Sequence, residues 1–364
     1  MDRKHVPSVM RETGENAYFA ASNSACGFHS YYAECFEREN IGRLFAIKGG
    51  PGTGKSRFMR DVAECAQGKG WSAEMIYCSS DPDSLDGVIL TRNGEGIALL
   101  DATAPHVYEP SHPGFREEIV NLGEFWNADA LRERKEEIAA LNQRKGGAYR
   151  RAYRYLSGYG AMDANRRETV APYLKEKAIA DFAAKLMQNV PEEREFNPRI
   201  ALIHSVGMRG AVGFDTYFAQ AKKIFLIEDC RGAAAKMMEA LYRCAAEKKL
   251  RVRVSKDPLL PDQVDALFLC GSGLVFAVCP KEECSYPFRK ISMRRFVDTG
   301  RMHAVRQSVN YTERMSRAML AGAIEELNVV REVHFGIEQI YVAAMDFEAK
   351  EAFTRTFCER LFGL

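Results

Sequence analysis

Eight residues with the sequence GGPGTGKS, at positions 49–56, constrain this chain more than any other stretch. They fit the pattern G-x-x-x-x-G-K-[ST] and lie between an apolar strand candidate, 44–47, and a helix candidate, 58–67. A glycine-rich loop in this setting presents backbone N–H groups at the start of a helix, where the peptide dipoles favour an anion. The sequence therefore predicts a phosphate-binding loop.

Each part of this loop has a predicted role in binding ATP and Mg²⁺. Glycines lack a Cβ atom, so the loop can adopt turns that other residues resist and can approach phosphate oxygens closely. We expect Lys55 to reach the β- and γ-phosphates and to stabilise charge on the transferred phosphoryl group, and the Ser56 hydroxyl to ligate Mg²⁺. The predicted nucleotide-binding residues are Gly49, Gly50, Pro51, Gly52, Thr53, Gly54, Lys55 and Ser56.

A second part of the site is predicted at Asp101, which ends the apolar run Ile-Ala-Leu-Leu. At the carboxyl end of a central strand, beside the loop, this carboxylate would hold Mg²⁺ directly or through water. The alternative is an aspartate that caps a turn. Ala102 and Thr103 follow, so no glutamate stands there to orient a water. This favours phosphoryl transfer to an acceptor, or slow turnover, over fast hydrolysis.

Four more polar residues have open roles. Asp81, Asp83 and Asp86 follow a strand candidate, 73–78, that we expect next to the loop strand. An acid there could accept a proton from an acceptor hydroxyl or join the metal ligands, whereas Asp-Pro-Asp-Ser is also the chemistry of a solvated turn. His106 could contact the γ-phosphate or an acceptor, or could be a packed or solvated histidine.

The chain contains an internal repeat. FAIKGGPGTGKSRFMRDVAECA in the first half matches FLIEDCRGAAAKMMEALYRCAA, 180 residues later, and DPDSLDGVIL matches LPDQVDALFL. Weaker matches pair Gly27 with Gly213 and Phe115 with Phe288. Repeated strand-turn-helix segments in a shared order predict two copies of one α/β unit.

We therefore expect a duplicated P-loop NTPase fold, with two three-layer α/β units and helix-rich extensions. The first unit, 1–195, has the intact loop, and the second, 196–364, is degenerate. Recurrence of Asp83 and Asp86 in the degenerate unit favours a structural role for them.

The second copy has lost the loop chemistry. Ala235 stands opposite Lys55, and Asp229 stands opposite Gly49, so that acids occupy the place where phosphate would bind. The nearest lysine, Lys236, comes one residue late, a rotation of about 100° on a helix. We expect the second copy to be a structural or regulatory partner of the first.

The composition is that of an ordinary soluble protein, with 46% hydrophobic residues and a net charge of +2. Such a charge argues against nucleic-acid or membrane binding by the whole surface. The N-terminal sequence MDRKHVPSVMRETGEN has no apolar run, so we expect no signal peptide, no membrane span and a cytoplasmic protein. Ten cysteines without a C-x-x-C pair predict reduced thiols rather than disulfides or a metal site. Cysteines among apolar neighbours, predicted to be buried, are Cys65, Cys244, Cys270 and Cys358.

Residues 131–167 are basic and rich in tyrosine, with ten Lys or Arg against four acids. They could form a lid over phosphates or a patch for RNA or DNA. The alternative is a helix whose tyrosines pack inward and whose arginines face water. Helical spacing of Ala148, Tyr149, Ala152, Tyr153 and Leu156 favours this alternative.

Taken together, the chain resembles an uncharacterised bacterial family of tandem P-loop proteins labelled ATPase or nucleotide-kinase-like. The resemblance rests on GGPGTGKS, on CSSDPDSLDGVIL (78–90), on LLDATAPHVYEPSHPG (99–114) and on a second half with a decayed loop. It covers nearly the whole chain and implies ATP binding, a duplicated P-loop fold and a cytoplasmic setting. It does not supply a substrate.

Three functions remain open at this stage. The first is an ATPase whose Mg²⁺-dependent hydrolysis drives a change between the copies, which the family labels favour. The second is a kinase for a nucleotide or another small molecule, and the third is a non-catalytic ATP-dependent interaction module. The acceptor, the choice between ATP and GTP, and the oligomeric state are not determined by the sequence.

Overall fold

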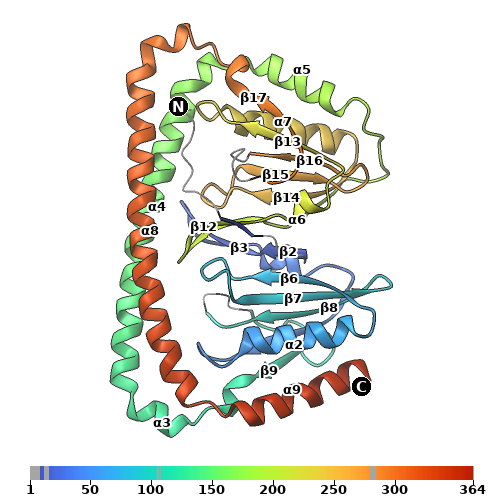
Figure 1. Cartoon of the computed structure of the whole chain (residues 1–364), viewed down its shortest axis with the longest axis vertical. Helices are drawn as coiled ribbons and strands as arrows, with labels where there is room; N and C mark the ends of the chain where they lie inside the picture. The colour runs from blue at the N-terminus through green and yellow to red at the C-terminus, as the bar shows by residue number, and fades with distance from the viewer. Residues whose placement is uncertain (1–8, 12–15, 105, 107, 279–283, 364) are drawn as a thin grey trace.

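Two six-stranded mixed sheets form the framework of the chain in a computed structural model that describes residues 9–11, 16–104, 106, 108–278 and 284–363 (Figure 1). The first sheet has the order β2-β6-β7-β8-β5-β9 and the second β10-β14-β15-β16-β13-β17. These orders agree strand for strand, which confirms two α/β units of one topology. The strands of the first sheet are β2 (Asn16–Phe19), β5 (Ile41–Lys48), β6 (Ser72–Tyr77), β7 (Leu85–Arg92), β8 (Glu95–Asp101) and β9 (Glu117–Asn121). Those of the second are β10 (Asn197–Ile200), β13 (Lys223–Glu228), β14 (Arg251–Lys256), β15 (Val264–Leu269), β16 (Leu274–Ala277) and β17 (Phe288–Ser292).

The strand before the loop, β5, is buried between two parallel neighbours, β8 and β9. Ile47 of β5 lies opposite Asp101 of β8, as expected for an acid beside the loop. The expectation that the strand at 73–78 lies next to the loop strand is wrong, because β7 and β8 separate β6 from β5. The hairpin of β7 and β8 is antiparallel and places its second strand, not β6, against β5.

Pairing across the strands fixes how the two copies correspond. The loop match is confirmed, since Phe45 lies opposite Leu99 and Phe225 opposite Phe276. Two outer matches are wrong by two or three residues, because the connecting loops differ in length and the matches were short. The structure instead makes Gly27 equivalent to Gly210, and Glu117 equivalent to Phe288.

Two long antiparallel helices, α4 and α8, run side by side along one side of the molecule and connect both units (Figure 1). The helices are α1 (Tyr32–Phe36), α2 (Lys55–Gln67), α3 (Ala128–Glu133), α4 (Lys135–Val170), α5 (Glu176–Met187), α6 (Thr216–Ala219), α7 (Ala233–Glu247), α8 (Arg306–Ala343) and α9 (Phe347–Phe362). Among the described helices, including these two, none combines the length and apolarity that crossing a membrane requires.

Each long helix carries a short helix across to the other copy. α9 follows the second sheet in the chain but packs on α2 of the first copy, where Phe357 contacts both Phe45 and Phe58. In the same way, α5 ends the first copy and packs on α7 of the second. Each loop helix therefore packs both on the sheet of its own copy and on a helix carried over from the opposite end of the chain.

Two β-hairpins also contact the opposite copy. They comprise β3 (Ala21–Ser24) with β4 (Gly27–Ser30), and β11 (His204–Gly207) with β12 (Gly210–Phe214), which also pairs with β1 (Val9–Arg11). The Met208 N–H donates to the Ser80 carbonyl at 2.8 Å, and its counterpart, the Ala25 N–H, donates to the Leu259 carbonyl at 2.9 Å. The tip of the β11–β12 hairpin thus contacts the loop after β6, and the tip of the β3–β4 hairpin contacts the loop after β14.

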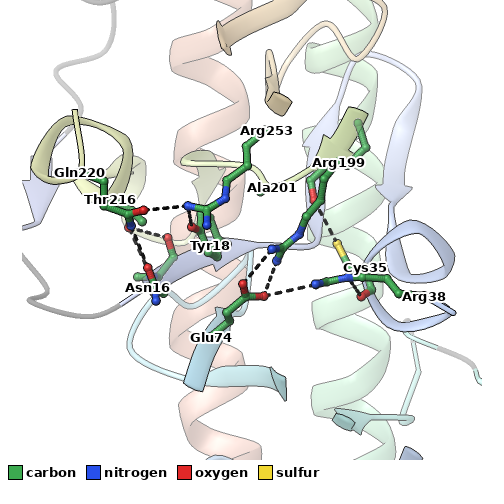
Figure 2. A network of polar contacts seen from close by, with 12 residues as sticks. Asn16, Tyr18, Cys35, Arg38, Glu74, Arg199, Ala201, Thr216, Gln220 and Arg253 are labelled. Carbon is green, nitrogen blue, oxygen red and sulfur yellow. Dashed lines mark hydrogen bonds and ion pairs between the residues drawn. The ribbon is translucent and has the colours of Figure 1, made fainter. Parts of the chain in front are cut away.

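Charged residues join the two sheet edges (Figure 2). Glu74 of β6 accepts hydrogen bonds from Arg199 of β10 and from Arg38 after α1. Arg253 of β14 donates to the Tyr18 hydroxyl at 2.8 Å. Burial alone would raise the pKa of Glu74, but the guanidinium groups of Arg199 and Arg38 outweigh it and lower that pKa.

The basic helix α4 packs its tyrosines inward, as its spacing predicted. Tyr149 and Tyr153 stack with ring centroids 6.0 Å apart, and the Tyr153 hydroxyl donates to Asn23 at 2.9 Å. Ala148, Ala152 and Leu156 on this face are fully buried against neighbouring elements. The inward-packing hypothesis for 131–167 therefore holds for Tyr149 and Tyr153, whereas Tyr155 is exposed and Arg166, expected to face water, is buried.

Candidate functional site

The loop between β5 and α2 has the backbone of an anion-binding nest. Gly52 and Gly54 have φ values of 73° and 78°, a region that favours glycine. Gly54 is the N-cap of α2, and among the described residues no side chain caps this helix start. The Thr53 hydroxyl donates to the Gly50 carbonyl at 2.9 Å and fixes the turn from within. Such a helix start favours a negative charge.

Lys55 and Asp101 come together at this loop. The Lys55 ammonium lies 3.5 Å from the Asp101 carboxylate and donates to the carbonyls of Gly49 and Gly50 at 2.9 Å each. Burial raises the pKa of Asp101 although the charge of Lys55 opposes this shift. The two residues predicted to act on phosphate and metal are therefore adjacent and mostly buried.

Thr103 connects the end of β8 to the loop, a role that the sequence analysis missed. Its N–H donates to the Asp101 carboxylate at 2.8 Å, and its hydroxyl donates to the Gly49 carbonyl at 2.9 Å. The threonine thus orients Asp101 and holds the start of the loop. A small hydroxyl residue two positions after a strand-ending aspartate was the available signal, and it is a weak one.

Ser56 lies at the first turn of α2, facing the start of β7. Its hydroxyl oxygen accepts a hydrogen bond from the Leu85 N–H at 3.0 Å. That bond orients the oxygen and leaves its second lone pair and its proton for other partners. The predicted role of Ser56 as a metal ligand stays a prediction.

The loop of the second copy has a different turn, with positive φ at Arg231 and Gly232 and a helix that begins two positions earlier in the repeat, and it holds its own carboxylate. Gly232, equivalent to Gly52, has a φ of 89°, and its N–H donates to Asp229 at 2.9 Å. The Ala234 N–H donates to the other oxygen of Asp229, also at 2.9 Å. Ala235 and Val278 replace Lys55 and Asp101. An acid side chain thus lies in the place where the first copy presents glycine.

The end of α8, from the second copy, covers the outer side of the intact loop. A Cβ atom on Gly50 would lie 2.8 Å from the Tyr341 ring, and one on Gly52 would lie 2.8 Å from the Glu338 carbonyl oxygen. Burial raises the pKa of the Glu338 carboxyl, and the charge of Asp81 adds to that shift while Lys55 opposes it. These contacts span nearly 300 positions, and no local sequence pattern indicates them.

Arginines contact the first two aspartates of the 81–86 cluster, Asp81 and Asp83. Arg209, at the hairpin tip of the second copy, pairs with Asp83 and lies 3.8 Å from Asp81. Arg11 pairs with Asp83 at 2.6 Å. The structural role favoured for Asp83 fits these contacts.

Asp86 and His106 form a buried pair. His106 Nε2 lies 3.1 Å from the Asp86 carboxylate, and only 6% of each side chain is exposed. The hypothesis of a solvated turn is therefore wrong for Asp86, because β7 begins before it and carries it into the core. Burial lowers the pKa of His106, but the Asp86 carboxylate outweighs this effect and the pKa is raised.

Comparisons with known proteins give no match, whether the chain is compared with family models, with curated proteins or with solved structures. The resemblance to tandem P-loop proteins stays a prediction from the motifs.

Proposed function

We propose that the first copy binds ATP with Mg²⁺ and turns it over, and that the second copy responds to that turnover. The observation that carries the proposal is the contrast between two loops at equivalent positions. In the second copy the N–H groups of Gly232 and Ala234 bind the Asp229 carboxylate. The first copy has Gly49 in place of Asp229, which leaves the start of its helix for an external anion.

The residues around the nest fit a nucleotide triphosphate. The Lys55 ammonium donates to the carbonyls of Gly49 and Gly50 and lies 3.5 Å from Asp101, which places it to turn toward phosphate oxygens bound at the loop. Ser56 and Asp101 would hold Mg²⁺, which neutralises phosphate charge when bound. Asp101 is oriented for this by Thr103.

Coupling between the copies is supported by what covers the loop. Tyr341 and Glu338 belong to α8 of the second copy and contact the loop of the first. A ligand that changes the loop conformation must change these contacts. Hydrolysis coupled to movement of α8 is therefore the form of turnover that we propose.

Kinase activity is the second candidate, and one observation favours it. Ala102 and Thr103 follow Asp101, and the Thr103 hydroxyl is engaged with Gly49, so neither residue can orient a water as a glutamate would. Transfer of the phosphoryl group to a bound acceptor does not need that glutamate.

The fate of the γ-phosphate tests both candidates. Purified protein is incubated with Mg²⁺ and γ-labelled ATP, with and without a pool of nucleotides and metabolites. We expect label to appear as free phosphate, whereas label on a pool component would assign a kinase and identify its acceptor. ATP binding without turnover would leave an interaction module, and absence of binding would refute the proposal.

A further inference from the structure

Three donor side chains lie close together beside the loop, at the end of the first sheet where β6 and β8 end and β7 begins. Cys78 follows β6, Asp86 lies in β7, and His106 follows β8. One sulfur, one oxygen and one nitrogen from these residues lie within 4.8 Å of one another. We propose that Cys78, Asp86 and His106 bind a zinc-like divalent metal ion, separate from the Mg²⁺ that accompanies ATP.

The cluster is enclosed by aromatic rings. Tyr32 stacks on the His106 ring with centroids 4.8 Å apart and planes 5° from parallel, and Phe28 meets that ring edge-on at 5.1 Å. These contacts hold the imidazole in one orientation and keep bulk water away from it. The ring is fixed before any metal arrives, which lowers the entropy cost of binding.

The two ring nitrogens of His106 differ in their surroundings. Nε2 faces the Asp86 carboxylate at 3.1 Å, so these two atoms, with the Cys78 sulfur, are the donors proposed to bind the metal. Nδ1, the other ring nitrogen, is buried and has no hydrogen-bond partner among the described residues.

The Cys78 sulfur is the third donor. Burial and the Asp86 carboxylate raise the pKa of its thiol well above the usual value, and backbone N–H groups of Ser80 and Asp81 that hydrogen-bond to the sulfur oppose this shift. A bound metal would replace the thiol proton. The sequence analysis predicted Mg²⁺ at Ser56 and Asp101 but no metal site at a cysteine, because it looked for a C-x-x-C pair and these three ligands lie on separate segments.

The donor types select the class of metal. Thiolate and imidazole suit Zn²⁺ and its neighbours in the first transition row, whereas Mg²⁺ prefers oxygen ligands. Three protein ligands leave a fourth tetrahedral position for water or substrate. Zinc ligands lie about 3.5 Å apart, so the three donors need to approach one another by roughly 1 Å.

The second copy lacks the set of ligands. Strand pairing makes Asp257 the counterpart of Cys78, and Asp265 the counterpart of Asp86. Asp265 pairs there with His204. This histidine comes from β11, whereas His106 of the first copy follows β8. The cysteine therefore accompanies the intact loop.

Cobalt spectroscopy tests the proposal without relying on nucleotide turnover. The full chain is freed of metal with a chelator and titrated with Co²⁺. We expect one Co²⁺ per chain, with a thiolate-to-cobalt absorption band in the near ultraviolet that excess Mg²⁺ does not remove. Cys78→Ser should abolish the band, and His106→Gln should weaken Co²⁺ binding at least about tenfold.

Cys65→Ser is the matched control, because Cys65 lies beside Cys358 and that pair of thiols is the competing soft site. It should keep the full band. A wild-type protein without the band, a band that survives Cys78→Ser, or a band lost in Cys65→Ser would overturn the proposal. Zn²⁺ should also raise the melting temperature of the wild type and not that of His106→Gln, which covers the case in which Cys78→Ser does not fold.

Discussion

The two loops of this protein follow equivalent strands but differ in backbone and in what fills them. The helix of the first copy begins after Gly54, whereas that of the second begins two positions earlier in the repeat, after Gly232. In the second copy Asp229 supplies the anion, whereas in the first the corresponding residue is Gly49 and a lysine stands nearby. The comparison teaches that an internal carboxylate can take up the free N–H groups at the start of a loop helix.

The exchange of parts explains why a copy without loop chemistry belongs to the site. Tyr341 and Glu338 of the second copy cover the intact loop, and Arg209 of the second copy pairs with Asp83. In the other direction, the guanidinium of Arg166 in α4 lies 3.1 Å from where a Cβ on Gly232 would be. Each long helix thus ends over the loop of the opposite copy.

The largest expected effect separates the two lysines. Lys55→Ala should reduce nucleotide turnover by about 10²–10³-fold, because the charge developing on the transferred group loses its cation. In the second copy the lysine nearest to the equivalent position is Lys236. Lys236→Ala should leave turnover unchanged, since Lys236 pairs with Glu239. Phosphate release and transfer are measured for both. Equal losses in the two variants would mean that the copies do not differ as proposed.

The next effect concerns the edge where the copies meet. Glu74 has Arg253 as its counterpart, so Glu74→Gln leaves Arg199 and Arg38 without their partner. We expect a loss of about 3 kcal/mol in the free energy of unfolding at pH 7, measured with urea. Arg253→Gln removes a bond to a neutral hydroxyl and should cost about 1 kcal/mol.

The ion pairs of Glu74 with Arg199 and Arg38 also predict that stability depends on pH. The pKa of Glu74 in the folded protein is lowered from 4.5 by its arginines despite burial. A lowered folded pKa means that the ion pair contributes fully above pH 4.5 and loses its contribution as the pH falls through the folded pKa. The difference between wild type and Glu74→Gln should therefore shrink below that pH. A difference that stays constant into acid would contradict the assignment.

A smaller effect is expected from emptying the second nest. Asp229→Ala leaves the Gly232 and Ala234 N–H groups without their acceptor and should cost about 2 kcal/mol in unfolding free energy. ATP turnover should not change. If turnover falls while stability does not, the second nest has a functional rather than a structural role.

The smallest effect tests the cover over the first loop. Tyr341→Ala removes an aromatic contact on Gly50 and should weaken ATP binding about fivefold, or roughly 1 kcal/mol. Tyr311→Ala is the control, because Tyr311 lies exposed at the far end of the same helix. Isothermal titration compares the two variants. Weakening by both would point to α8 as a whole rather than to its end.

Local patterns gave the loop, its flanking strand and helix, and the position of Asp101 beside them. They failed where a decision depended on neighbours distant in the chain. Cys270 was expected to be buried among apolar residues and is exposed, because it falls in the turn after β15. For Asp86 the sequence left a solvated turn open as an alternative, and strand pairing instead carries it inward.

What the sequence determined by itself follows from short-range physics. Glycine spacing sets the nest, helical periodicity sets the inward face of α4, and the repeated order of segments sets two α/β units of one topology. What only the tertiary structure decided follows from packing between elements far apart in the chain. Three features depend on which apolar faces bury each other, and no local pattern encodes that choice. They are the pairing of α4 with α8, the contacts of α8 with Gly50 and Gly52, and the proximity of Cys78 to His106.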